Sequence, residues 1–149
     1  MTLIPFSQRV QRSFRRRVAS YEPHARLQRS MAWRLAGLAH HRGWSRSKAP
    51  LLALPPGPCA DLGAGTGLLG RALAAWGVPL PGPLLQLDLC GEALARNGAG
   101  PTLPWDLNDG LPPQLQGAAL LASSFALQWL LDPSKALARW GEQIGRAHV

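Results

Sequence analysis

Residues 58–73 read PCADLGAGTGLLGRAL, and this stretch decides the fold of the chain. Small and apolar residues surround Asp61, three glycines follow at alternate positions, and an apolar run with helical spacing begins at Leu68. The pattern predicts a buried strand, a tight turn and a helix start. Such glycines let the backbone adopt positive φ and approach a ligand closely, while a helix N-terminus offers unpaired N–H groups. We therefore expect a nucleotide-like ligand here, with a purely structural turn as the alternative.

The positions of Asp61 and of the glycines indicate which kind of nucleotide-like ligand the loop suits. The dinucleotide fingerprint G-x-G-x-x-G would require a glycine at position 68, where this chain has Leu68. The chain instead has Asp61 followed by Gly63, Gly65 and Gly67. A carboxylate beside the loop would repel a pyrophosphate but suits a ligand that carries an ammonium and a sulfonium. The loop thus resembles motif I of the Rossmann-like methyltransferases that use S-adenosylmethionine.

A second acid stands at the end of the next predicted strand. Residues 84–89 read as a buried strand, and Asp88 lies near its carboxyl end, 21 positions after Gly67. In a βαβ unit an acid at about 20 residues' distance reaches the ribose hydroxyls of a bound nucleotide. The alternative is that Asp88 caps the following helix, and the two roles are compatible.

Composition and charge restrict the class of protein. A chain of 149 residues with 46% hydrophobic residues has room for one domain with a core. Of its 16 Lys and Arg residues, 11 precede residue 51, where Glu22 is the only acid. This basic end suits an acidic protein, an anionic lipid surface or nucleic acid, although an arginine-rich composition also fits a GC-rich genome.

Cysteines and apolar runs give further expectations. Cys59 and Cys90 lie far apart without histidine-rich neighbours, so we predict neither a metal site nor a disulfide framework. The N-terminal residues lack an apolar run of signal-peptide length, and no later stretch reaches about 18 uninterrupted apolar residues. We therefore expect a cytoplasmic protein.

Periodicity along the chain predicts alternating helices and strands. An amphipathic helix is expected from Val10 to Tyr21, and a second helix opened by Pro23, with Leu27, Met31, Leu35 and Leu38 on its apolar face. After the two strands above, we expect a strand at 101–107, another within 116–125, and a last helix capped by Asp132 or Ser134. The expected fold is α/β, with a parallel sheet that binds its ligand at the carboxyl ends of the strands.

Four stretches together point to one family. They are VQRSFRRRVASYEPHARLQ, DLGAGTG, LDLCGEAL and SSFALQW. From about Val10 to Trp140 the chain resembles malonyl-[acyl-carrier protein] O-methyltransferase of biotin synthesis, a class I S-adenosylmethionine-dependent methyltransferase. The resemblance implies a basic helical lid over residues 1–50 and a Rossmann-like core over 51–143. It also implies S-adenosylmethionine as cofactor and a malonyl thioester of acyl carrier protein or coenzyme A as substrate.

The resemblance also implies roles for residues at matching positions. Asp61 and the three loop glycines would bind the methionine end of the cofactor, Asp88 the ribose, and Leu89 the adenine. Asp106 would bind the adenine amino group, with Asp109 as a rival because PWDLNDGLP departs from the family pattern. The other implied cofactor contacts are Ser123, Phe125 and Gln28. The implied positioning candidates are Tyr21, His24, Gln128 and Trp129.

The implied reaction is methylation of a free carboxylate. Such a carboxylate is already ionised at neutral pH, so no general base is expected and positioning supplies most of the acceleration. His24 and Arg15 to Arg17 are candidates for binding the carboxylate or the acidic carrier protein, although a solvated basic face is the simpler interpretation. The rival functions are methylation of another small molecule or of RNA, and a basic nucleic-acid-binding module.

The C-terminal end gives a separate expectation. A complete enzyme of the resembled class has seven strands, whereas this sequence reaches only the fourth. The terminal IGRAHV is what a common sequencing adapter followed by a stop codon would encode. We therefore expect a C-terminally truncated and inactive fragment whose residues 144–149 form a non-native tail.

Overall fold

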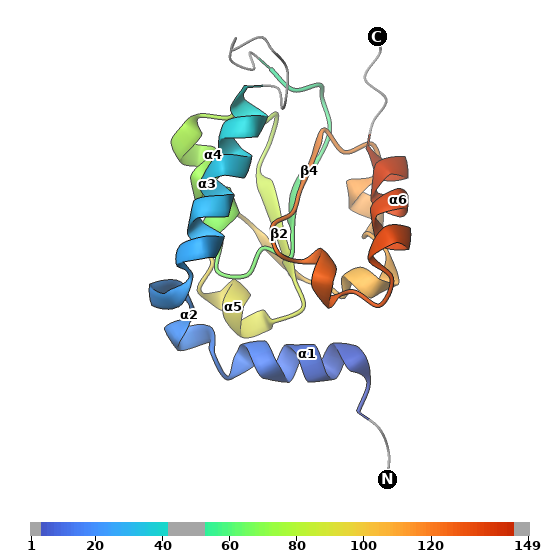
Figure 1. The fold of residues 1–149 in the computed structure, drawn as a ribbon. Coiled ribbons are helices and arrows are strands. Elements are labelled where there is room, and N and C mark those ends of the chain that lie inside the picture. The colour runs from blue at the N-terminus through green and yellow to red at the C-terminus, as the bar shows by residue number, and fades with distance from the viewer. Residues whose placement is uncertain (1–3, 42–52, 145–149) are drawn as a thin grey trace.

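The structure is a computed structural model that describes residues 4–41 and 53–144 (Figure 1). Its α-helices are α1 (Phe6–Arg15), α2 (Val18–His24), α3 (Arg26–His40), α4 (Leu68–Trp76), α5 (Gly91–Ala95) and α6 (Pro133–Gln143). Its strands are β1 (Cys59–Leu62), β2 (Leu84–Asp88), β3 (Thr102–Pro104) and β4 (Leu120–Ala122). Three short 3-10 helices complete it: η1 (Leu107–Asp109), η2 (Pro113–Leu115) and η3 (Leu127–Trp129).

The four strands form one parallel sheet in the order β3-β2-β1-β4. Strand β1 is central: Cys59 pairs with Leu84 on one side and with Leu120 on the other. The order reverses between β1 and β4, and such a reversal opens a crevice at the carboxyl ends of an α/β sheet. The predicted parallel α/β sheet is therefore present, with its crevice next to Asp61.

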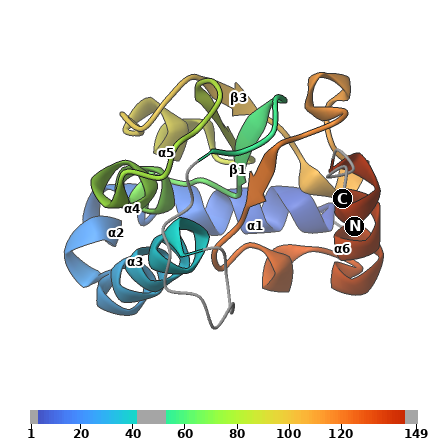
Figure 2. The same cartoon turned by 90° about the horizontal axis from the view of Figure 1, so that it is seen from above.

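Alternate residues of the central strands point to opposite faces of the sheet, and each face has its own core. Cys59 and Leu84 pack with α3 and α4, against Ala36 and Leu73. Ala60, Leu62 and Leu87 pack on the other face against residues that include Leu107, Leu115 and Trp140 of α6. Figure 2 shows α3 and α4 together on one side of the sheet and α6 on the other.

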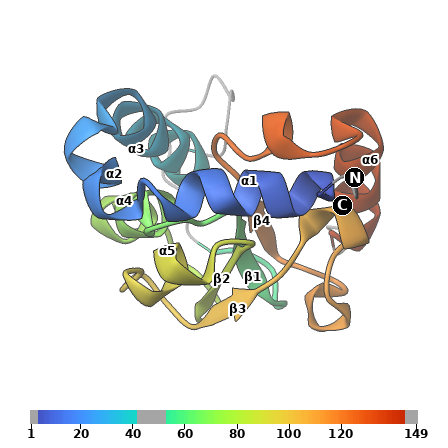
Figure 3. The same cartoon turned by 90° about the horizontal axis from the view of Figure 1, so that it is seen from below.

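Helix α1 lies across the carboxyl ends of the strands, and α2 continues along their edge toward α3 (Figures 1 and 3). The prediction of a single helix from Val10 to Tyr21 is wrong, because the chain turns at Arg16 and Arg17. There the N–H of Arg17 donates to the carbonyl of Phe14, a bond three residues long that ends the α-helical ladder. The N-terminal segment therefore has three helices instead of two.

The predicted apolar face of α3 and the predicted position of Pro23 also need correction. Pro23 lies in the last turn of α2, where its missing N–H helps to end that helix, and α3 begins at Arg26. Leu27 is exposed, and the buried face of α3 consists of Ala32, Ala36 and Gly37. Small residues form this face because α4 approaches closely.

Two further expectations concern chain ends and boundaries. The predicted lid-core boundary near residue 50 lies outside the described residues. At the other end, Gln143 accepts a backbone hydrogen bond from Ala118, and Ile144 forms a parallel bridge with the same residue. The rest of the expected tail, residues 145–149, lies outside the described part of the chain. Within residues 4–41 and 53–144 we find no helix with the length and apolarity needed to cross a membrane.

Two helical glycines allow a matched test of the α3–α4 contact. A Cβ on Gly37 would lie 3.0 Å from the Trp76 ring, whose indole N–H donates to the carbonyl of Trp33. Gly37→Ala should therefore destabilise the chain by about 1 kcal/mol, because the steric cost of overpacking exceeds the stability that alanine adds to a helix in place of glycine. Gly141→Ala, in α6 with open space around it, should stabilise the chain by about 0.5–1 kcal/mol. Chemical denaturation measures both changes, and equal effects would contradict the close contact.

Candidate functional site

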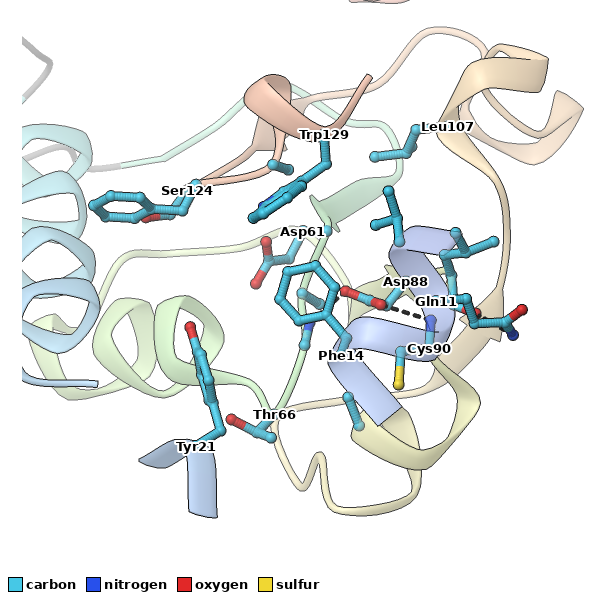
Figure 4. A pocket seen from close by; sticks show the side chains of 18 of the residues that line it. Gln11, Phe14, Tyr21, Asp61, Thr66, Asp88, Cys90, Leu107, Ser124 and Trp129 are labelled. Atoms are coloured by element: carbon cyan, nitrogen blue, oxygen red, sulfur yellow. Dashed lines mark hydrogen bonds between the residues drawn. The ribbon is translucent and has the colours of Figure 1, made fainter. Parts of the chain in front are cut away.

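A cavity of about 270 Å³ lies between the carboxyl ends of the strands and the helices α1 and α2. Its floor is the glycine loop after β1, its sides come from the segments after β2, β3 and β4, and its roof is the inner face of α1. Figure 4 shows Asp61, Asp88, Phe14 and Trp129 directed into this space. The cavity thus occupies the crevice where α/β sheets bind their ligands.

The loop after β1 owes its shape to glycines at positive φ. Gly63, Gly65 and Gly67 have φ of 77°, 53° and 93°. A Cβ at Gly63 would lie 2.4 Å from the Cβ of Ala126, so that site admits only glycine. A Cβ at Gly65 would instead extend into open space at the cavity. Gly63 and Gly67 therefore shape the loop, while Gly65 keeps a surface of the cavity free of side chains.

Asp61 is the most unusual group of the site. Its side chain is 1% exposed, and its Oδ2 has no hydrogen-bond partner within the described residues. Burial, followed by the nearby Asp88 carboxylate, raises the pKa of Asp61 to about 7. A buried acid oxygen without a partner is costly unless a cation or donor from outside the chain meets it. The cavity therefore has a position for a positively charged group beside Asp61.

Asp88 links the second strand to the glycine loop. Its Oδ2 accepts from the N–H of Gly65 at 2.9 Å, and its Oδ1 accepts from the N–H of Cys90 at 2.7 Å. Burial raises the pKa of Asp88, although these backbone donors oppose the shift. A carboxylate has about four acceptor sites, so two remain for hydroxyl donors in the cavity. The N-cap of α5 is Cys90, so Asp88 does not itself cap this helix; it accepts from the N–H of the capping residue. Its contact with ribose hydroxyls stays a prediction.

A polar network fixes the loop from below. The buried Gln86 accepts through Oε1 from Nδ2 of Asn97 at 2.9 Å, and the same Nδ2 donates to the carbonyl of Gly65 at 3.1 Å. A Cβ at Gly67 would lie 2.7 Å from Oδ1 of Asn97. The position of Gly65 is therefore held from one side by Asp88 and from the other by Asn97.

Contacts from several elements hold α1 over the cavity. Gln11 donates to the carbonyl of Leu89 at 3.1 Å, and the ring of Phe14 meets that of Trp129 edge to face at 5.1 Å. At the ends of the helix, Asn108 donates to Ser7 at 3.2 Å, and Arg15 pairs with Glu92 at 2.7 Å. These partners of α1 lie in the segments after β2, β3 and β4, so one helix contacts the chain after three strand ends.

A second set of contacts joins α2 to the glycine loop. Arg71 of α4 pairs with Glu22 of α2 and donates to the carbonyl of Thr66 at 2.7 Å. Burial tends to raise the pKa of Glu22, but the nearby Thr66 hydroxyl, the hydrogen bond from Arg71 and the charges of Arg71 and Arg29 lower it overall. Glu22 is therefore ionised at neutral pH, and one arginine connects lid and loop.

Most of the residues predicted for the site do meet at the cavity. Those that line it are Asp61, Gly63, Gly65, Asp88, Leu89, Asp106, Phe125, Gln28, Tyr21 and Trp129. Asp109 is exposed and does not line it, so the geometry favours Asp106 over its rival. Phe125 adopts φ of 58°, an uncommon conformation for a large side chain that is typical of functional sites.

Four predicted residues lie elsewhere. His24 and Gln128 are exposed, and neither lines the cavity, so their proposed positioning roles lack a contact with it. Ser123 donates to the carbonyl of Leu62 at 2.9 Å and so joins β4 to β1. Gly67 forms the N-cap of α4. Ser123 and Gly67 therefore support the elements around the cavity without lining it.

Several cavity residues were not foreseen. Gln11, Phe14 and Cys90 line the cavity, and burial raises the pKa of the Cys90 thiol, which keeps it protonated and a poor nucleophile. Burial, then Asp88 and Glu22, raises the pKa of Tyr21, whose hydroxyl is thus a donor at neutral pH. The helical spacing of Phe14 and Val18 was a usable signal, but nothing in the sequence indicated that Cys90 faces the cavity.

Comparisons with known proteins identify the fold. No family model and no curated protein matches the sequence. The structure is similar to the crystal structure of a Methanococcus maripaludis protein described as a proposed S-adenosyl-L-methionine-dependent methyltransferase, with a TM-score of 0.57 and 14% sequence identity. The likeness covers 99% of this chain and 63% of the other. It confirms the predicted Rossmann-like α/β fold, and the resemblance to one family of such enzymes stays a prediction.

The raised pKa of Asp61 makes a prediction about stability. Between about pH 4 and pH 7 the folded chain keeps a proton that the unfolded chain releases, so stability should fall as pH rises through this range. Asp61→Asn removes this titration and should stabilise the free chain at pH 8 by on the order of 3 kcal/mol. Thermal melts of both proteins from pH 5 to pH 8 measure the effect. A constant difference between the two melting curves across this range would contradict it.

Proposed function

We propose that this chain binds S-adenosylmethionine and belongs to a methyltransferase that depends on it. The observation that carries the proposal is the unpartnered, buried carboxylate of Asp61 at the floor of a cavity formed by a glycine loop. S-adenosylmethionine offers an ammonium and a sulfonium, the kind of charge that would stabilise the ionised form of this acid. The likeness of the fold to that of a proposed methyltransferase supports the same assignment.

The cavity residues fit the parts of this cofactor. Asp61 and Gly65 would bind the methionine end, and the two free acceptor sites of Asp88 would take the ribose hydroxyls. Leu89 and Asp106 also line the cavity, and we propose that they receive the adenine. When bound, the cofactor supplies an electrophilic methyl group. A cation beside Asp61 also lowers the pKa of this acid, so cofactor affinity should rise with pH up to about 7.

The acceptor that we propose is the free carboxylate of a malonyl thioester on acyl carrier protein or coenzyme A. The support comes from the sequence, from the stretches around Tyr21 and Trp129, and both of these residues line the cavity. Three carboxylates line it as well, Asp61, Asp88 and Asp106, and none is required as a base because the acceptor oxygen is already ionised. Methylation of another small molecule or of RNA remains the alternative for the same cofactor.

The residues of this chain would then act by positioning and by excluding water. The rings of Phe14 and Trp129 form an apolar wall, and Phe125 lines the same cavity. The hydroxyl of Tyr21, which stays protonated at neutral pH, would offer a hydrogen bond to a bound ligand from α2. With an acceptor bound, these groups would hold its oxygen in line with the methyl group and reduce its hydration, which are the two main sources of acceleration for this kind of transfer.

Two glycines at positive φ give a matched test of cofactor binding. Gly65→Ala and Gly77→Ala each place a methyl group in open space at positive φ, so each should cost about 1 kcal/mol of stability. Only Gly65 lines the cavity; Gly77 caps the far end of α4. Calorimetric titration should show cofactor affinity lowered about tenfold or more by Gly65→Ala and nearly unchanged by Gly77→Ala. Wild-type affinity in both variants would refute the site.

The acceptor is tested separately with radiolabelled cofactor. We expect methyl transfer to malonyl carrier protein or malonyl coenzyme A above that to small carboxylic acids and RNA, with Gly77→Ala as active control and Asp61→Asn as inactive control. Transfer only to another acceptor would overturn the malonyl assignment while leaving the cofactor assignment intact. Cofactor binding without transfer to any of these acceptors would contradict the malonyl assignment for this chain.

A further inference from the structure

We propose that a pocket on the outer face of the lid binds a phosphate group of the acceptor, while the methyl-accepting end of that molecule reaches the cavity. This arginine pocket is lined by Arg9, Arg12, Ser13, Arg16 and Arg17. The inference rests on the proposed function, since it concerns the molecule that would enter the same cavity. It adds a binding site outside that cavity and a chemical class for the acceptor.

Helical geometry brings the arginine pocket together. Arg9, Arg12 and Arg16 are spaced three and four residues apart, so they lie along one face of α1 and its last turn. The residues that face the cavity, among them Gln11 and Phe14, lie on the opposite side. One helix thus separates the two sites.

The arginine pocket and the cavity adjoin. Ser13 and Arg17 line both of them. Arg17 is also the only Lys or Arg that lines the cavity within the described residues, whereas Asp61, Asp88 and Asp106 line it as acids. The cavity itself therefore favours a cation. An anionic part of the acceptor would be stabilised only by Arg17, which lines both sites, and by the other arginines of the arginine pocket.

The charges of the arginine pocket lack counter-ions. Within residues 4–41 and 53–144 the ion pairs are Arg15 with Glu92 and Arg71 with Glu22, so the four pocket arginines have no carboxylate within 4 Å. Like charges gathered around one hollow repel one another and attract an anion. Arg9 is further held over the ring of Phe6 at 5.8 Å, a contact that orients its guanidinium.

The simpler interpretation, a solvated basic face that stabilises a helix end, accounts for part of this cluster only. Arg12 lies in the last turn of α1, where a cation interacts favourably with the helix dipole. Arg17, however, occupies the N-cap position of α2, where the dipole disfavours a cation. Arg17 also follows directly on the C-terminal end of α1, whose dipole favours a cation, so helix dipoles do not decide its placement. Its position at the border between the arginine pocket and the cavity, without a carboxylate partner among the described residues, makes its charge available to an anion.

Phosphate fits the arginine pocket better than a lone carboxylate does. Guanidinium groups bind phosphate oxygens through paired hydrogen bonds, and a phosphate offers three or more oxygens to several arginines at once. Four arginines provide more positive charge than one carboxylate neutralises. The acceptor that we infer is thus a molecule with a phosphate at one end and its methyl-accepting group at the other.

The first experiment uses pyrophosphate as a probe with the full chain at low ionic strength. Arg12→Gln with Arg16→Gln removes two charges from the arginine pocket, and neither residue lines the cavity. Arg34→Gln with Arg139→Gln removes two exposed charges from α3 and α6 as a matched control. Calorimetric titration should show pyrophosphate affinity about tenfold lower in the pocket variant and nearly unchanged in the control. Equal losses in both variants, or no binding to wild type, would overturn the proposal.

A second experiment distinguishes a free phosphate from a phosphate attached to the acceptor. Malonyl coenzyme A and malonyl pantetheine share the thioester, but only the former carries phosphates. The wild-type chain with S-adenosylmethionine should bind malonyl coenzyme A about tenfold more tightly, and the pocket variant should lose most of this difference. If the wild-type chain bound malonyl coenzyme A and malonyl pantetheine equally tightly, the arginine pocket would bind only free anions, and the proposal would be overturned. Tighter binding of single-stranded DNA than of malonyl coenzyme A would also overturn it, in favour of a nucleic-acid surface.

Cofactor affinity, measured in every variant, separates the two proposals. It should be unchanged in the pocket variant and in its control, because none of the four substituted arginines lines the cavity. Absence of cofactor binding by the wild-type chain would refute the proposed function while the pyrophosphate titration still reported on the arginine pocket. Normal cofactor binding together with unchanged pyrophosphate affinity in the pocket variant would refute only the further inference.

Discussion

The site depends on the burial of one carboxylate at the end of the central strand. Asp61 lies in β1 with β2 and β4 on either side, so both neighbouring strands shield its side chain from water. The chain must then leave β1 at once without covering this acid. Gly63 allows that turn, and the position that its missing Cβ would occupy is filled by Ala126 from the segment after β4. The acid, the glycine and the small residue from a distant segment thus form one geometric unit.

Helix α1 lies over the cavity, and its two sides differ in chemistry. The inner side of α1 offers Gln11 to the carbonyl of Leu89 and Phe14 to the ring of Trp129. The outer side has arginines without acidic partners among the described residues. The cavity therefore presents acids, and its border presents arginines. This division of charge within one helix follows from helical periodicity alone.

The sequence predicted those features that follow from local chemistry. Glycines at alternate positions indicated the loop at positive φ, and Asp132 does cap α6 by accepting from the N–H of Lys135. The break between α1 and α2 was missed because no glycine or proline marks Arg16 and Arg17. The buried face of α3 was misplaced because large apolar residues were taken as its mark, whereas the approach of α4 required Gly37 and alanines.

The site was predictable to the extent that single positions determine it. Asp61 and Asp88 were found because each lies at or next to the end of a recognisable strand. Asp106 was preferred to Asp109 only through the resemblance, because the two stand three residues apart in a segment whose path depends on η1. The network of Gln86 and Asn97 was not foreseen either, since it joins residues from two elements that only the folded sheet brings together.

The edge-to-face contact of Phe14 with Trp129 also bears on the order in which the molecule assembles. The two rings belong to residues 115 positions apart, so bringing them together closes most of the chain into a loop and carries a large entropic cost. Contacts of such long range form late, after the shorter connections of β1 with β2 have reduced that cost. During synthesis α1 is made long before η3, which supplies Trp129. Until η3 has emerged, the apolar side of α1 therefore stays exposed, and a nascent chain offers it to any other apolar surface.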